Sequence, residues 1–159
     1  MSIDRDIALL RGIATFDLLS DGAVRLLAQG AEEMRLAEGD VLFRMNETSD
    51  GAFVVVSGRL KMMDERLPGA PRLLKDVTAG ALVGETALII ATPRPATAVA
   101  GEETVVIRLP REVFTRVLER YPEVTAKFRR AIARRLEGTL RALDGVRVKL
   151  EEHRQRRRR

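Results

Sequence analysis

Apolar residues recur at helical spacing near both ends of the chain, and the middle carries short apolar runs separated by turn residues. Ile3–Leu10 has apolar residues at its first, fifth and eighth positions, which predicts a short amphipathic helix. Ser20 suits the N-cap of a second helix that we expect to end near Gly30. We expect both helices to pack on the outside of a barrel.

Between these helices and residue 110 the pattern is typical of a small β-roll. The predicted strands are Met34–Leu36, Val41–Arg44, Ala52–Val56, Leu60–Glu65, Arg72–Val77, Ala81–Val83, Ala96–Ala100 and Thr104–Leu109. The sequence therefore predicts an α+β fold, in which a roll resembling a double-stranded jelly-roll barrel is flanked by N-terminal helices and a long C-terminal helix.

Two further helices are predicted after the roll. The first is Arg111–Arg120, and Pro122 suits the first position of the second. Apolar residues form one stripe along that second helix: Val124, Phe128, Ile132, Leu136, Leu140, Leu143, Val146 and Leu150. We expect the inner part to cover the roll. The outer part needs a partner, and a second copy is the simplest one, so we expect a homodimer through the helix Val124–Leu150.

Basic and acidic residues are unevenly distributed along the chain. Residues 1–110 carry 12 Lys/Arg against 16 Asp/Glu, whereas residues 111–159 carry 16 against 7. With 159 residues and 45% apolar residues, we expect one ligand-binding domain over residues 1–140 and an extended helix with a basic tail over residues 141–159. The tail Arg154–Arg159 could bind nucleic acid, or it could be a solvated terminus.

Residues with catalytic chemistry are scarce. The chain has no cysteine, which suits a reducing cytoplasm and excludes a thiol nucleophile. Its one histidine, His153, lies in the basic tail, and no Ser/His/Asp, paired-carboxylate or metal-ligand set can be assembled. No apolar run is long enough to span a membrane, and the N-terminus does not look like a signal peptide. We therefore do not expect an enzyme, and we expect neither a cofactor nor a metal.

The segment Leu82–Ala100 carries the strongest functional signal. A strand end leads to Gly84, a helical turn or two is predicted over Glu85–Ile90, and Pro93 stops it just before Arg94. A helix start presents unpaired N–H groups to an anion, and an arginine can fork onto a phosphate. By spacing alone, however, Glu85 could be an ordinary helix-start charge and Arg94 a solvated turn residue.

This segment resembles the phosphate-binding cassette of the cyclic nucleotide-binding domain family, which includes catabolite activator protein-like and channel-like sensor domains. The family pattern is Phe-Gly-Glu-Leu/Ile-Ala-Leu, a short spacer, and Pro-Arg-x-Ala-Thr. The matching residues here are Gly84, Glu85, Ala87, Leu88, Pro93, Arg94, Ala96 and Thr97. The family's turn glycines also have counterparts, at Gly39, Gly58 and Gly80.

The resemblance implies a sensor for cyclic AMP or cyclic GMP. In the family, the glutamate holds the ribose 2′-hydroxyl, the arginine pairs with the cyclic phosphate, and the threonine can reach the base. The site residues implied here are Gly84, Glu85, Thr86, Ala87, Arg94, Pro95, Ala96 and Thr97. Binding would then move the helices after the roll, and we expect a stand-alone sensor whose effector the sequence does not identify.

Pro95 departs from the family pattern. Relatives place Ala, Ser or Thr there and use its backbone N–H for the phosphate, which proline lacks. A lost bond to a charged group costs about 1.5–3 kcal/mol, or about ten- to a hundredfold in affinity. Two alternatives therefore stay open: a degenerate roll that serves as a dimerisation or scaffold piece, and a minimal nucleic-acid-binding regulator that uses the basic tail.

Overall fold

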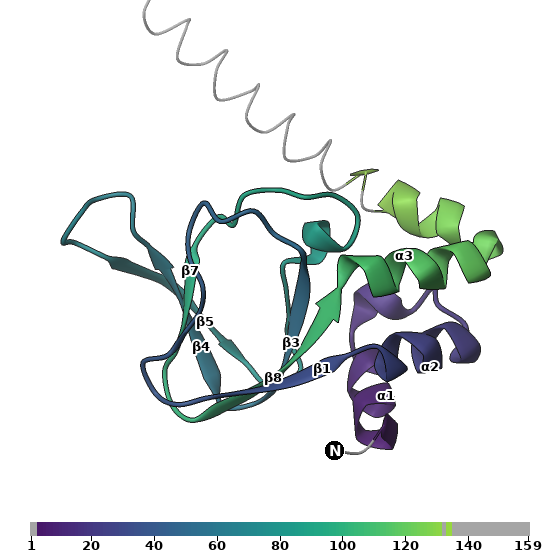
Figure 1. The fold of residues 1–159 in the computed structure, drawn as a ribbon, viewed down its shortest axis with the longest axis horizontal. Helices are drawn as coiled ribbons and strands as arrows, with labels where there is room; N and C mark the ends of the chain where they lie inside the picture. Colours follow the sequence, from purple (N-terminus) through teal and green to yellow (C-terminus); the bar gives the residue numbers. More distant parts are fainter. Residues whose placement is uncertain (1–2, 132, 135–159) are drawn as a thin grey trace, which may run out of the picture.

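The computed structural model describes residues 3–131 and 133–134, and it has a β-roll on one side and helices on the other (Figure 1). Within this part of the chain, eight strands form two antiparallel four-stranded sheets, in the orders β1-β8-β3-β6 and β2-β7-β4-β5. The strands are β1 (Glu32–Leu36), β2 (Val41–Phe43), β3 (Gly51–Ser57), β4 (Arg59–Asp64), β5 (Arg72–Thr78), β6 (Leu82–Val83), β7 (Thr97–Ala100) and β8 (Thr104–Pro110). The sheets face each other without closing into a barrel.

Strand β3 separates two hydrophobic cores. Successive side chains of a strand point to opposite faces. Phe53 and Val55 therefore pack inside the roll, whereas Ala52 and Val54 pack against the helices. This division explains why the strand is apolar at every position from 52 to 55.

The helices cover the outer face of β3 and β8. They are α1 (Ile3–Arg11), the 3₁₀ helix η1 (Ala14–Phe16), α2 (Asp21–Gln29) and α3 (Arg111–Arg120). The Ser20 hydroxyl caps α2 by accepting from the Ala23 amide at 3.3 Å, as predicted. Residues 122–131 form a further helix, and its buried Phe128 packs against Phe114 of α3 with tilted rings whose centroids are 4.9 Å apart.

The predicted fold class is confirmed, with small corrections at element ends. Strand β1 begins at Glu32, two residues earlier than predicted, because Arg108 of the neighbouring β8 pairs with Glu32 at 2.8 Å and extends the ladder. The helical segment after Gly84 is shorter than predicted: η2 (Glu85–Leu88) is a single 3₁₀ turn. A run of four residues is typical of that helix type.

Several predictions lie outside the described residues. These are the domain boundary at residue 140, the inner stripe residues Ile132 and Leu136, the outer stripe from Leu140 to Leu150, and the basic tail Arg154–Arg159. Val124 and Phe128, the first two residues of the stripe, do pack against the helical core. In residues 3–131 and 133–134, none of the helices has the length and apolar character needed to cross a bilayer.

Candidate functional site

The loop between β2 and β3 holds the cassette in place through its backbone. The Arg94 amide donates to the Glu47 carbonyl at 2.7 Å, and the Asn46 amide donates to the Arg94 carbonyl at 2.8 Å. Asn46 has φ 72°, a left-handed conformation that asparagine tolerates better than most residues. Ser49 and Thr92 add two bonds, at 2.9 and 3.1 Å. The backbone of Arg94 is therefore fixed on both sides.

The side chain of Arg94 points into the protein and is only 4% exposed. Its Cζ lies 4.4 Å from the ring centroid of Phe43 and 5.4 Å from that of Phe53, within the range of cation–π attraction. Its Nη2 donates to the Gly51 carbonyl at 2.8 Å and lies 3.8 Å from Asp50 Oδ1. These contacts aim the guanidinium rigidly, which disfavours the interpretation of Arg94 as a solvated turn residue.

The other terminal nitrogen of Arg94 is incompletely satisfied. Nη1 is buried and has no hydrogen-bond partner among the described residues. Burial lowers the pKa of Arg94, although the charges of Asp50 and Glu47 oppose that shift. A buried guanidinium stays charged in proteins, so its free N–H groups require an acceptor. The structure therefore contains a cationic donor suited to an anion.

Gly84 keeps the space beside this nitrogen open. Its φ is 79°, in the left-handed region, and a Cβ at this position would lie 2.6 Å from Arg94 Nη1. Glycine is thus required at this position for two reasons: it adopts the left-handed backbone conformation, and it leaves room next to the guanidinium. A phosphate oxygen could occupy the region that a larger residue would block.

A cavity of about 450 Å³ opens at this point between the cassette and strands β4 and β5. Its lining residues are Phe43, Met62, Leu74, Lys75, Asp76, Val77, Thr78, Ala81, Leu82, Val83, Gly84, Arg94, Pro95 and Ala96. Apolar side chains dominate this lining, which also includes the Arg94 guanidinium, and such a composition is typical of small-molecule sites. Four of the eight predicted site residues therefore come together here: Gly84, Arg94, Pro95 and Ala96.

The other four predicted residues are not among those that line the cavity. Glu85 Oε2 accepts a hydrogen bond from the Thr15 hydroxyl at 3.1 Å. The Ala87 amide donates to the Gly84 carbonyl at 3.0 Å, so the turn itself uses one amide of the predicted anion cradle. Thr86 is half-buried in the same turn.

Thr97 is fully buried, and its hydroxyl accepts from the Met45 amide at 2.9 Å. In this structure the hydroxyl ties β7 to the chain just after β2. Its contact with a base stays a prediction from the resemblance.

Sequence reasoning missed the residues that support Arg94. Phe43 and Phe53 come from two different strands, and only the folded roll places both rings against the guanidinium. Thr15 is 70 residues from Glu85, and no spacing pattern in the sequence links them. Asp50 and Gly51 stand directly before the predicted strand Ala52–Val56, which was the one signal available for that pair.

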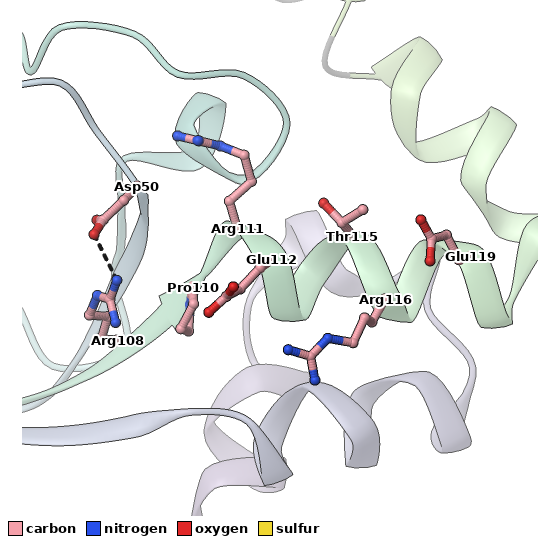
Figure 2. A pocket seen from close by; sticks show the side chains of 8 residues that line it. All are labelled: Asp50, Arg108, Pro110, Arg111, Glu112, Thr115, Arg116 and Glu119. Atoms are coloured by element: carbon pink, nitrogen blue, oxygen red, sulfur yellow. Dashed lines mark hydrogen bonds and ion pairs between the residues drawn. The ribbon is translucent and has the colours of Figure 1, made fainter.

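A second hollow, of about 540 Å³, lies outside the roll at the start of α3 (Figure 2). Its lining mixes charges of both signs, and Arg108 is already paired with Asp50 at 2.7 Å. Arg111 turns from this hollow toward the cassette, where its Nε donates to the Ala87 carbonyl at 2.8 Å and its Nη2 to the Ser49 carbonyl. None of the predicted site residues lines this hollow, and we therefore place the candidate site at Arg94.

Comparisons with known proteins point to one family. The family described as "Cyclic nucleotide-binding domain" matches residues 33–121, more than half of the chain. A solved cyclic nucleotide-binding-like protein from Brucella abortus is 38% identical with a TM-score of 0.67, over 72% of this chain and 97% of that one. The N-terminal domain of a transcriptional regulator from Streptomyces coelicolor A3(2) is 32% identical with a TM-score of 0.75, over 85% and 94%.

Curated relatives share only this module. "Lysophospholipase NTE1" from Chaetomium globosum is 26% identical over 69% of this chain and 7% of its own length. The human patatin-like phospholipase domain-containing protein 6 is 28% identical over 67% of this chain and 8% of its own length. The chain thus spans less than a tenth of these relatives.

Proposed function

The chain belongs to the cyclic nucleotide-binding domain family, and on that basis we propose that it is a regulatory module that binds cyclic AMP or cyclic GMP in the cavity beside Arg94. Membership of this family makes the chain a regulatory domain of the cyclic nucleotide-binding type.

One observation carries the proposal. Arg94 Nη1 is buried without a partner in the described part of the chain, and Arg94 lines a cavity of about 450 Å³. A singly charged cyclic phosphate would supply the missing acceptor and counter-charge. A charge-assisted hydrogen bond in a desolvated site is worth more than one in water. The apolar lining from Phe43, Met62 and Val77 would then accommodate the sugar and base.

The remaining predicted residues keep their proposed roles around this anchor. The backbone N–H groups of Glu85 and Thr86 would bind the phosphate, since the third amide of the predicted cradle, that of Ala87, bonds within the turn. The Glu85 carboxylate would accept from the ribose 2′-hydroxyl, and Gly84 would leave room for the phosphate. Ala96 would border the ligand, and Thr97 would be the residue of β7 closest to the base. Pro95 supplies no N–H, so we expect weaker binding than a relative with alanine there would show.

The output of the site would pass through Arg111, the first residue of α3. Its side chain bonds both the Ala87 carbonyl of the cassette and the Ser49 carbonyl of the adjoining loop. A ligand that shifts the cassette must therefore either stretch these hydrogen bonds or move α3 together with the cassette. The ligand can change the equilibrium between the two arrangements of α3 only by the difference between its binding free energies to them.

Further parts of the proposal concern the assembly and the setting of the module. We propose a cytoplasmic homodimer through the helix Val124–Leu150 and an effector that is still to be identified. Pro95 favours one competing function, a roll that no longer binds nucleotide and acts as a dimerisation or scaffold piece. The tail Arg154–Arg159 motivates a third, a nucleic-acid-binding regulator, which a salt-dependent shift of duplex DNA would support.

Calorimetric titration of the full chain with cyclic AMP and cyclic GMP tests the proposal. We expect micromolar binding of at least one ligand, and we expect Arg94→Ala to abolish it while thermal unfolding stays cooperative. Comparison of the two ligands shows which base is preferred. If neither ligand binds at millimolar concentration, the sensor proposal is wrong and the scaffold function is favoured.

A further inference from the structure

Strand β5 turns a lysine toward the cavity beside Arg94. Lys75 pairs in register with Met62 of β4, which is only 6% exposed and belongs to the core inside the roll. Directly paired residues of neighbouring strands point to the same face of a sheet, and so do residues two positions apart along one strand. Val77, two positions after Lys75, is also buried inside the roll. Lys75 therefore belongs to the inner face of the sheet, and it is one of the residues that line the cavity.

The neighbouring carboxylate, Asp76, belongs to the opposite face of the sheet, although its residue also borders the cavity. Asp76 pairs in register with Lys61, and its Oδ1 lies 3.5 Å from Arg59 Nη1. Arg59 and Lys61 alternate along β4 with buried residues, so both belong to the outer face. Asp76 is thus held by an arginine outside the roll. Within the part of the chain that the structure describes, no carboxylate forms an ion pair with Lys75.

Lys75 and Arg94 contribute to the cavity lining from separate strands. Met62, the partner of Lys75, pairs in turn with Ala98 of β7. Two strand spacings of about 4.8 Å each therefore separate Lys75 from β7, about 10 Å in all. Arg94 is four residues before Ala98, shortly before the chain enters β7. A ligand that places its phosphate at Arg94 and extends across the sheet to β5 presents its far end, the base, to Lys75.

We propose that Lys75 is a specificity-determining residue that favours a guanine base, so that cyclic GMP is the preferred ligand of this cavity. The inference rests on the proposed function and narrows it from two ligands to one. An ammonium group has three donors and no acceptor. Guanine presents two acceptors, O6 and N7, along one edge, whereas adenine presents N7 beside its donating 6-amino group. A side chain that only donates therefore satisfies guanine and leaves the amino group of adenine without an acceptor.

Calorimetric titrations of the full chain with cyclic GMP and cyclic AMP test this assignment. We expect the natural chain to bind cyclic GMP about tenfold more tightly than cyclic AMP. Lys75→Met keeps the length of the side chain and removes its donors, so the ratio of the two affinities should fall about tenfold, to near one. Lys75→Arg keeps the donors and should keep the preference. Because Lys75 is exposed, both variants should unfold at nearly the temperature of the natural chain.

Lys61→Met is the matched control, because Lys61 belongs to the outer face of the same sheet and is not among the residues that line the cavity. This variant should keep the natural preference for cyclic GMP. A general attraction between the Lys75 charge and anionic ligands would change both affinities together in Lys75→Met and leave their ratio constant.

Cyclic IMP separates the two edges of guanine. Its base keeps O6 and N7 but lacks the 2-amino group, so it should bind like cyclic GMP and lose affinity with it in Lys75→Met. Three results would overturn the inference while leaving the proposed function intact: no preference for cyclic GMP in the natural chain, an unchanged ratio in Lys75→Met, or binding of cyclic IMP that matches cyclic AMP. Absence of binding by all three ligands would overturn the inference and the proposed function together.

Discussion

Replacing Gly84 by alanine tests the geometry of the anion site without replacing a charged residue. Two costs follow from the structure. An L-residue at φ 79° is destabilised by about 1–2 kcal/mol in the left-handed region. The new Cβ would also lie 2.6 Å from Arg94 Nη1, closer than a carbon and a nitrogen can approach, so the guanidinium must move.

The displacement predicts a large effect on ligand binding. If the phosphate bonds to Nη1, moving that nitrogen costs about 1.5–3 kcal/mol, which is about ten- to a hundredfold in affinity. Phe43, Phe53 and the Gly51 carbonyl hold the guanidinium in its present place, so the side chain has little room to adapt. We therefore expect alanine at position 84 to weaken binding of cyclic AMP by at least tenfold.

Gly39→Ala is the matched control. Gly39 has φ 89°, lies in an ordered turn with its amide donating to the Ala100 carbonyl at 2.8 Å, and has open space where a Cβ would be. Both variants should lose about 1–2 kcal/mol of unfolding free energy in denaturant titrations. Only the variant at Gly84 should lose affinity in calorimetry. Equal affinities for the two variants would show that Arg94 Nη1 does not face the ligand.

The other predictions address the phosphate, the link to α3 and the stability at low pH. Pro95→Ala restores a backbone N–H and should tighten cyclic AMP binding about tenfold by calorimetry; an unchanged affinity would mean that the missing amide does not impair the site. Arg111→Met removes two hydrogen bonds and should lower the unfolding free energy by about 1–3 kcal/mol in denaturant, whereas Arg116→Met on the exposed face of the same helix should change it by less than about 0.5 kcal/mol. Arg66 holds the pKa of Asp64 below its usual 3.8, so ionised Asp64 stabilises the fold above that pH, and the contribution is lost as the pH falls through the lowered pKa. The midpoint temperature of thermal unfolding, measured from about pH 6 to pH 2.5, should therefore decrease more steeply for the natural chain than for Asp64→Asn. Parallel curves for the two proteins would contradict this prediction.

Local patterns predicted most of the fold. The strands of the roll, the N-cap at Ser20 and the burial of Phe128 follow from hydrophobic spacing and turn chemistry, and the structure confirms them. The boundaries were less accurate because partners far along the chain decide them. Strand β1 extends to Glu32 through Arg108, which is 76 positions away.

The candidate site was predictable only in part, for the same reason. Gly84 and Arg94 were found from a contiguous segment, and the structure brings both to one cavity. The contacts of Arg94 with the rings of Phe43 and Phe53, and the bond from Thr15 to Glu85, depend on tertiary packing that no local spacing encodes. The segment alone therefore could not reveal which residues elsewhere in the protein contact its polar side chains.

A crystal structure of the full chain grown with cyclic AMP is the most direct test of the central claim. We expect a phosphate oxygen within about 3 Å of Arg94 Nη1, beside Gly84 and inside the cavity lined by β4 and β5. If the cyclic phosphate lies elsewhere, and Nη1 still has no acceptor, Arg94 is not the anchor of this site and the account is wrong.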